Sequence, residues 1–128
     1  MVVDDFQPFR RFICSKLRQK PEVQVIWEVS DGLEAVQRAE ELKPDLILLD
    51  IGLATLNGIE AARRIRGLVP ESKIIFLTLE SSADVVQEGM RLGAWGYVFK
   101  AHAESDLLQA LDVVLSGKRF VSSQRDRT

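Results

Sequence analysis

The chain has 128 residues, of which 46% are hydrophobic and 28% charged, a composition that favours one folded domain over a disordered chain. With 17 basic and 19 acidic residues the formal net charge is −2, which argues against nonspecific nucleic-acid binding, and a single cysteine excludes an internal disulfide. No apolar run is long enough to span a membrane and no secretory signal is visible, so we expect a cytoplasmic protein with no membrane partner.

The predicted elements alternate between strands and helices along the chain. Apolar and β-branched runs predict the strands, and apolar side chains at helical spacing predict the helices. In chain order the strands cover residues 1–3, 23–29, 45–50, 73–79 and 95–99, and the helices that follow them cover residues 6–17, 31–42, 58–66, 81–92 and 103–116. Residues 1–117 are expected to form one domain, and residues 118–128 a tail or the start of a linker.

Two of the predicted strands contain uninterrupted apolar runs, at residues 46–49 and 74–77. A strand without alternation is buried on both faces, which is typical of a parallel sheet. Strands that alternate with helices form βαβ units with right-handed crossovers, and these units place helices on both faces of the sheet. The sequence therefore predicts an α/β fold, a three-layer sandwich around five parallel strands.

Polar side chains follow four of these strands. Asp4 and Asp5 come after the first strand, Asp50 ends the third, Thr78 lies at the end of the fourth and Lys100 follows the fifth. Open α/β sheets bind ligands outside the carboxyl ends of their strands. Each residue alone has an ordinary explanation as a solvated loop residue, but the five together predict one polar site at this edge.

These residues resemble the motifs of a known family, the receiver domain of two-component response regulators. The matching motifs are Val3-Asp4-Asp5, Leu48-Leu49-Asp50, Thr78 and Phe99-Lys100, in the family's order and spacing. The segments 57–61, 93–97 and 104–107 are most similar to the LuxR-type (NarL/FixJ) subgroup. The resemblance covers about the whole chain, and it implies a flavodoxin-like (βα)5 fold with strand order 2-1-3-4-5.

The resemblance implies a magnesium site, and the acidic residues support it physically. Three carboxylates held together repel one another, and a hard divalent cation with oxygen ligands relieves that repulsion. We expect Asp5 and Asp50 to bind Mg²⁺, with Asp4 contributing directly or through water. The backbone carbonyl of Gly52 is a further ligand by resemblance.

The family chemistry then assigns the remaining residues. Asp50 is the expected nucleophile, which accepts a phosphoryl group from a sensor histidine kinase. Lys100 and Thr78 are expected to contact the phosphoryl oxygens. Because this chemistry modifies only the chain itself, by its own phosphorylation and dephosphorylation, we do not expect an enzyme that acts on a separate substrate.

A conformational switch and an output domain are also implied by the resemblance. When Thr78 moves inward it vacates space for the ring of Tyr97, which shifts the face built from the fourth helix, the fifth strand and the fifth helix. The implied output is a C-terminal helix-turn-helix domain beyond this chain that binds DNA and controls transcription. The chain itself is not expected to bind nucleic acid, and a homodimer is left open.

Two other functions are weighed against this hypothesis. A degenerate receiver would keep the fold and bind partners without phosphorylation, but a scaffold needs none of the five polar residues. An aspartate-based phosphohydrolase would have a second aspartate two residues after Asp50, where this chain has Gly52. The chain also has Ala54 and Ala101 where the family often has proline.

Overall fold

The computed structural model describes residues 1–53, 55–79 and 83–122. In this part of the chain one parallel sheet has the strand order β2-β1-β3-β4-β5-β6. The strands are β1 (Val2–Val3), β2 (Glu28–Val29), β3 (Leu46–Asp50), β4 (Lys73–Thr78), β5 (Gly96–Phe99) and β6 (Phe120–Val121). The order 2-1-3-4-5 expected from the resemblance is confirmed for the first five strands.

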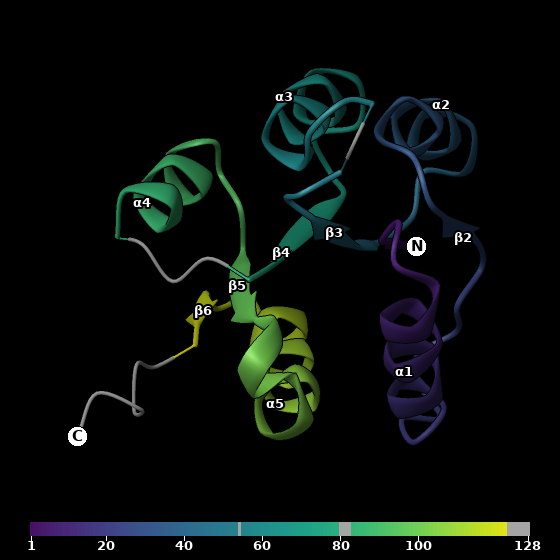
Figure 1. Cartoon of the computed structure of the whole chain (residues 1–128), viewed down its shortest axis with the longest axis vertical. Helices are drawn as coiled ribbons and strands as arrows, with labels where there is room; N and C mark the ends of the chain where they lie inside the picture. The colour runs from purple at the N-terminus through teal and green to yellow at the C-terminus, as the bar shows by residue number, and fades with distance from the viewer. Residues whose placement is uncertain (54, 80–82, 123–128) are drawn as a thin grey trace.

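Helices cover both faces of the sheet and so form the outer two layers of the predicted sandwich. They are α1 (Gln7–Leu17), α2 (Gly32–Leu42), α3 (Gly58–Leu68), α4 (Ala83–Arg91) and α5 (Ala103–Leu115), and a short 3₁₀ turn, η1 (Lys100–His102), precedes the last of them. Figure 1 shows α2, α3 and α4 above the sheet and α1 and α5 below it. None of the helices in the described ranges is both long and apolar enough for a membrane span.

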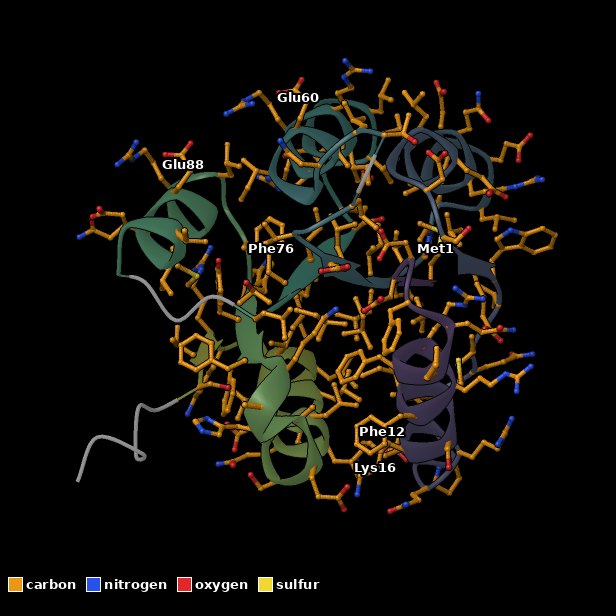
Figure 2. All side chains as sticks on the ribbon, in the orientation of Figure 1. Met1, Phe12, Lys16, Glu60, Phe76 and Glu88 are labelled. Atoms are coloured by element: carbon orange, nitrogen blue, oxygen red, sulfur yellow. The ribbon has the colours of Figure 1, made fainter. Side chains whose placement is uncertain are left out.

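The core lies in two layers, one on each face of the sheet. Ile47 and Leu49 point toward α2 and α3, whereas Leu48 between them points toward α1 and α5. All three side chains are at most 2% exposed. Figure 2 shows Phe76 inside the molecule and Glu60 at its outer edge. The uninterrupted apolar run of β3 is therefore buried on both faces, as predicted.

Side-chain caps begin two of the helices. The Asp31 carboxylate accepts a hydrogen bond from the backbone N–H of Leu33 at 2.6 Å, which starts α2. The Asn57 amide oxygen accepts one from the N–H of Glu60 at 2.9 Å, which starts α3 directly after the loop that follows β3. Such caps contribute about 1 kcal/mol each. The first two residues of the helix predicted over 81–92 lie outside the described residues.

The structure corrects the sequence prediction at two strands. Residues 23–29 were expected to form a strand, but only Glu28–Val29 does, because β1 is two residues long and offers only the pairs Val2↔Glu28 and Val3↔Val29. The five-stranded prediction also misses β6, which pairs with the outer edge of β5 inside the segment expected to be a tail. Two residues are too few to show the alternation that identifies a strand in a sequence. This strand forms because the outer edge of β5 is available for pairing.

Candidate functional site

The carboxyl ends of four strands meet at one edge of the sheet. Because Val3 pairs with Leu49, Asp4 lies beside Asp50 at the next position of both strands. Thr78 pairs with Phe99, the residue before Lys100. Four of the five predicted site residues, Asp5, Asp50, Thr78 and Lys100, line an open hollow of about 630 Å³, and Asp4 is buried beside it in contact with Lys100.

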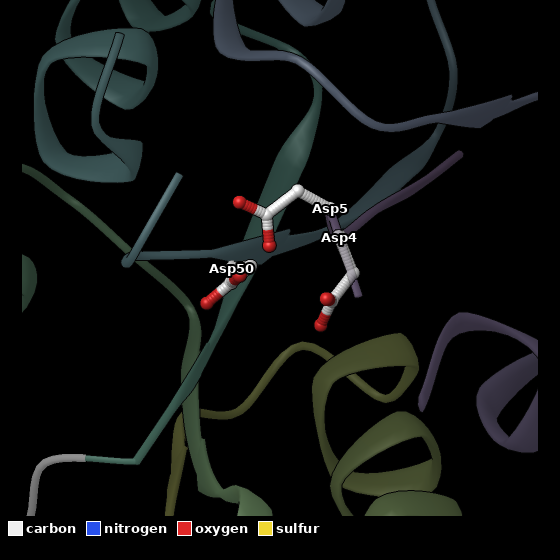
Figure 3. Close-up of side chains that lie close together, drawn as sticks. All are labelled: Asp4, Asp5 and Asp50. Carbon is white, nitrogen blue, oxygen red and sulfur yellow. The ribbon is translucent and has the colours of Figure 1, made fainter. Parts of the chain in front are cut away.

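Three carboxylates form the acidic part of the site. Asp4, Asp5 and Asp50 each place an oxygen within 4.8 Å of the other two (Figure 3). Asp4 is completely buried and Asp50 is 5% exposed, whereas Asp5 is exposed. The cluster therefore joins two desolvated carboxylates to one that solvent and ions can reach.

Lys100 supplies the positive charge beside these carboxylates. Its Nζ lies 2.8 Å from Asp4 Oδ2 and 3.4 Å from Asp50 Oδ1. The same ammonium lies 4.8 Å from the centre of the Phe9 ring, which covers it from α1. The Lys100 side chain is only 11% exposed, so these ion pairs lie in a weakly screened environment.

The environment of Asp50 disfavours its charged form. Burial, followed by the neighbouring charge of Asp4, raises the pKa of the Asp50 carboxyl above its usual value. The Gly52 N–H donates to Asp50 Oδ1 at 3.0 Å, and this hydrogen bond and the Lys100 ammonium lower the pKa in part. A further cation at the site would favour the ionised carboxylate that a nucleophile needs.

Backbone contacts hold Asp4 in place. Asp4 Oδ1 accepts a hydrogen bond from the N–H of Phe6 at 2.8 Å, and the Asp4 carbonyl accepts one from Arg10 Nη1 at 2.7 Å. Sequence reasoning assigned no role to Phe9 or Arg10. Their position on the first turns of the helix after Asp5 was the only signal that they would contact the site.

Tyr97 lies inside the fold. Its side chain is 0% exposed, and its ring centre is 5.7 Å from that of Phe76 and 6.3 Å from that of Phe99. Tyr97 is on β5, and the neighbouring strand β4 ends in Thr78. The Thr78 side chain is also buried, at 3% exposure. The two residues of the predicted switch, Thr78 and Tyr97, therefore lie on neighbouring strands, and the ring of Tyr97 packs inward.

The oxygen donors at this site fit a hard cation such as Mg²⁺. The cluster combines an accessible carboxylate, Asp5, with two buried ones. Among the described residues, Asp4 Oδ2 has the Lys100 ion pair but no aligned hydrogen-bond donor. Buried, under-satisfied carboxylate oxygens are the groups that a divalent cation stabilises.

Comparison with known proteins identifies the family of the chain. The family model of the response regulator receiver domain matches residues 1–112. The chain belongs to this family. Transcriptional regulatory protein DegU of Brevibacillus brevis is 32% identical to this receiver domain over 121 residues, which are 94% of this chain and 51% of DegU. The receiver domain thus spans about half the length of that curated relative.

Solved structures confirm the fold and the subgroup of the receiver domain. A LuxR-family response regulator from Aurantimonas superposes with a TM-score of 0.91 at 30% identity, over 98% of this chain and 89% of that one. The isolated receiver domain of RcsB from Salmonella enterica, solved with the phosphomimetic BeF₃⁻, also gives 0.91, at 25% identity over 98% of this chain and 94% of that one. The flavodoxin-like fold and the LuxR-type resemblance are confirmed.

Proposed function

We propose that this receiver domain accepts a phosphoryl group on Asp50 from a sensor histidine kinase, in a Mg²⁺-dependent reaction. One observation carries the proposal: Asp50 ends β3 at an open hollow, between two other carboxylates and an ammonium 3.4 Å away. An Asp50 oxygen would attack phosphorus as the bond from phosphorus to the donor's imidazole nitrogen breaks. The donor imidazole keeps the electron pair of that bond.

The acidic residues would hold the cation beside the nucleophile. Asp5 and Asp50 are the proposed ligands, with Asp4 binding directly or through water and the Gly52 carbonyl as a further ligand. Bound Mg²⁺ would supply positive charge for the phosphoryl oxygens. Because Asp5 is the exposed member of the cluster, exchange of the ion with solvent would occur on its side.

Lys100 and Thr78 would receive the phosphoryl group. Lys100 Nζ is shared between Asp4 and Asp50, so a small shift toward Asp50 would bring it to a phosphoryl oxygen. The Thr78 hydroxyl, at the end of the neighbouring strand, would donate to another. Both groups stabilise charge on the transferred phosphoryl group, and that is the main task in a reaction with little covalent chemistry.

The output of the reaction would be a changed protein surface. Movement of Thr78 toward the phosphoryl group would be coupled to Tyr97 on the adjacent strand, and so to the surface formed by α4, β5 and α5. We propose that this surface controls a DNA-binding helix-turn-helix domain, since DegU is a transcriptional regulatory protein about half covered by this chain. Direct DNA binding by this chain is not proposed, homodimerisation stays open, and action in the cytoplasm stays a prediction.

Phosphorylation by a small donor tests the proposal. The protein is incubated with phosphoramidate and Mg²⁺, and intact mass is measured for the wild type, Asp50→Asn and Asp45→Asn. Asp45 is a matched control, an exposed aspartate directly before the first residue of the same strand. We expect one phosphoryl adduct on the wild type and on Asp45→Asn, none on Asp50→Asn, and none when EDTA removes Mg²⁺.

Two results would overturn the proposal. A wild type that gains no adduct would leave a degenerate receiver as the better interpretation. Continuous hydrolysis of phosphate monoesters, with release of inorganic phosphate, would favour a phosphohydrolase.

A further inference from the structure

Strand β6 is attached to the part of β5 that contains the proposed switch. The N–H of Phe120 donates to the Trp95 carbonyl at 3.0 Å, and the N–H of Ser122 donates to the Tyr97 carbonyl at 2.8 Å. Val121 is the register partner of Tyr97. Figure 1 shows β6 at the end of the sheet beside β5. The last described residues of the chain are therefore hydrogen-bonded to the backbone of Tyr97.

The Ser122 hydroxyl fixes the far end of β6. Ser122 Oγ donates to Asp106 Oδ2 at 2.8 Å and accepts a hydrogen bond from the N–H of Phe99 at 3.1 Å. Ser122 and Asp106 are each 3% exposed. Buried polar groups that satisfy one another in this way hold one geometry, because breaking the set leaves desolvated atoms without partners. Phe99 directly precedes Lys100, so the Ser122 hydroxyl is hydrogen-bonded to the backbone of the residue next to the site lysine.

A second anchor holds the residues before β6. The Arg119 guanidinium lies 4.5 Å from the centre of the Trp95 ring, and its Nε donates to the Ala94 carbonyl at 3.1 Å. Lys73 Nζ lies 4.4 Å from the same ring centre. Anchors on both sides of β6 make residues 119–122 a docked segment of the sheet.

We propose that the Ser122–Asp106 contact is a latch that couples the phosphorylation site to the chain following residue 122. The inference rests on the proposed function of Asp50 and Lys100. When Lys100 binds a phosphoryl oxygen, its backbone becomes less mobile, and so does that of Phe99, the last residue of β5. The Phe99 N–H is hydrogen-bonded to Ser122. A less mobile end of β5 favours the form in which β6 is paired with β5. The Ser122 hydrogen bonds favour the same form. Coupling between two sites is reciprocal, so Ser122 must in turn strengthen binding of the phosphoryl group.

Hydrogen exchange of the wild type tests the first half of the inference. The backbone amides of Phe120 and Ser122 are followed by NMR with Mg²⁺ alone and with Mg²⁺ and beryllofluoride, an analogue of the phosphoryl group. We expect the analogue to slow exchange of both amides, by about fivefold or more. This comparison needs no variant, so a folding defect cannot obscure it.

The Ser122→Ala variant tests the second half. Ser116→Ala is the matched control, because its exposed hydroxyl donates to the Val113 carbonyl within α5 rather than to Asp106. We expect Ser122→Ala to exchange the β6 amides about tenfold faster and to bind beryllofluoride about fivefold more weakly, with Ser116→Ala unchanged in both. Ser122 is a positioning residue, and only coupling to the site predicts the loss of affinity.

The outcomes separate this inference from the proposed function. A wild type that does not bind beryllofluoride with Mg²⁺ would overturn the function of Asp50. A wild type that binds it with unchanged exchange in β6, or a Ser122→Ala variant with unchanged or tighter binding, would overturn the latch and leave the proposed function standing.

Discussion

The Lys100 ammonium lies 2.8 Å from Asp4 and 3.4 Å from Asp50, so at the scale of single residues one cation is shared between two buried carboxylates. Asp5 adds a third carboxylate within 4.8 Å. The local net charge is therefore negative, and the burial of Asp4 and Asp50 limits how far water can screen it. The first two predictions follow from this net charge.

The charge of Asp50 is expected to destabilise the fold when no cation is bound. Since the pKa of Asp50 is raised in the folded protein, the folded state binds this proton more tightly than the unfolded state. The contribution of Asp50 to the free energy of unfolding therefore falls as the pH rises from the ordinary carboxyl pKa through the raised one. In EDTA, Asp50→Asn should be more stable than the wild type at neutral pH and close to it near pH 4.

Urea unfolding at several pH values measures this effect, with Asp45→Asn as the control. Mg²⁺ should then stabilise the wild type more than Asp50→Asn, because binding to the folded state shifts the unfolding equilibrium. A variant that is less stable than the wild type at neutral pH in EDTA would contradict the prediction.

Removal of the Lys100 ammonium should slow phosphorylation. We expect Lys100→Ala to form the Asp50 adduct roughly 10²-fold more slowly, as for loss of one group that stabilises transition-state charge. A time course of intact mass with phosphoramidate and Mg²⁺ measures the rate. Lys118→Ala, which changes an exposed lysine, should react like the wild type. Equal rates for both variants would exclude a role of Lys100 in the transfer.

At the scale of secondary-structure elements, α4 packs against β5 through a glycine. A Cβ atom at Gly89 would lie 2.9 Å from Tyr97 Cε2 and 3.0 Å from two ring carbons of Phe76. Real Cβ contacts are essentially never shorter than 3.0 Å, so the inward position of the Tyr97 ring depends on the absence of a side chain at residue 89. A Cβ at Gly67, on α3, would meet no atom within 4 Å.

Alanine should therefore be tolerated at Gly67 but should disturb the packing of α4 at Gly89. Gly67→Ala is expected to stabilise the protein by up to about 1 kcal/mol, through helix propensity alone. Gly89→Ala is expected to move α4 or to turn the Tyr97 ring outward. Tyr97 is the single tyrosine of the sequence, so ¹⁹F NMR of fluorotyrosine-labelled protein reports on this ring alone. An unchanged resonance in Gly89→Ala would refute this dependence.

At the scale of the whole molecule, two apolar layers share one sheet. Leu107 of α5 is 0% exposed in the layer that also contains Leu48, while Leu49 lies in the layer on the other face. Because adjacent residues of β3 serve both layers, loss of packing on one face also weakens the strand that carries Asp50. We therefore expect the domain to unfold as one cooperative unit.

A core substitution tests this cooperativity. Leu107→Ala should lower the free energy of unfolding by about 2–5 kcal/mol, whereas Leu68→Ala, at a side chain that is 46% exposed, should cost far less. Circular dichroism and tryptophan fluorescence during urea unfolding should give coincident transitions. Separate transitions would show that the two layers unfold independently.

The sequence by itself determined the parallel arrangement of the central strands and the polar residues at which they end. Residues 46–49 and 74–77 have no polar position, so they can be buried only between two layers, and such strands are parallel. Parallel strands end at a common edge, so Asp4, Asp50 and Thr78 had to lie at that edge, while the strand order that makes them neighbours came from the family resemblance. These features depend on local composition and on chain direction, both of which the sequence contains.

Tertiary structure alone decided the details that depend on neighbours. The length of β2 follows from the two residues of β1, and β6 forms because β5 has a free edge. The ion pair of Lys100 with Asp4 joins residues near opposite ends of the chain, and the close approach of Gly89 to the Tyr97 ring depends on how α4 packs on β5. No periodicity or motif contains such contacts, because the packed elements set the distances between their atoms.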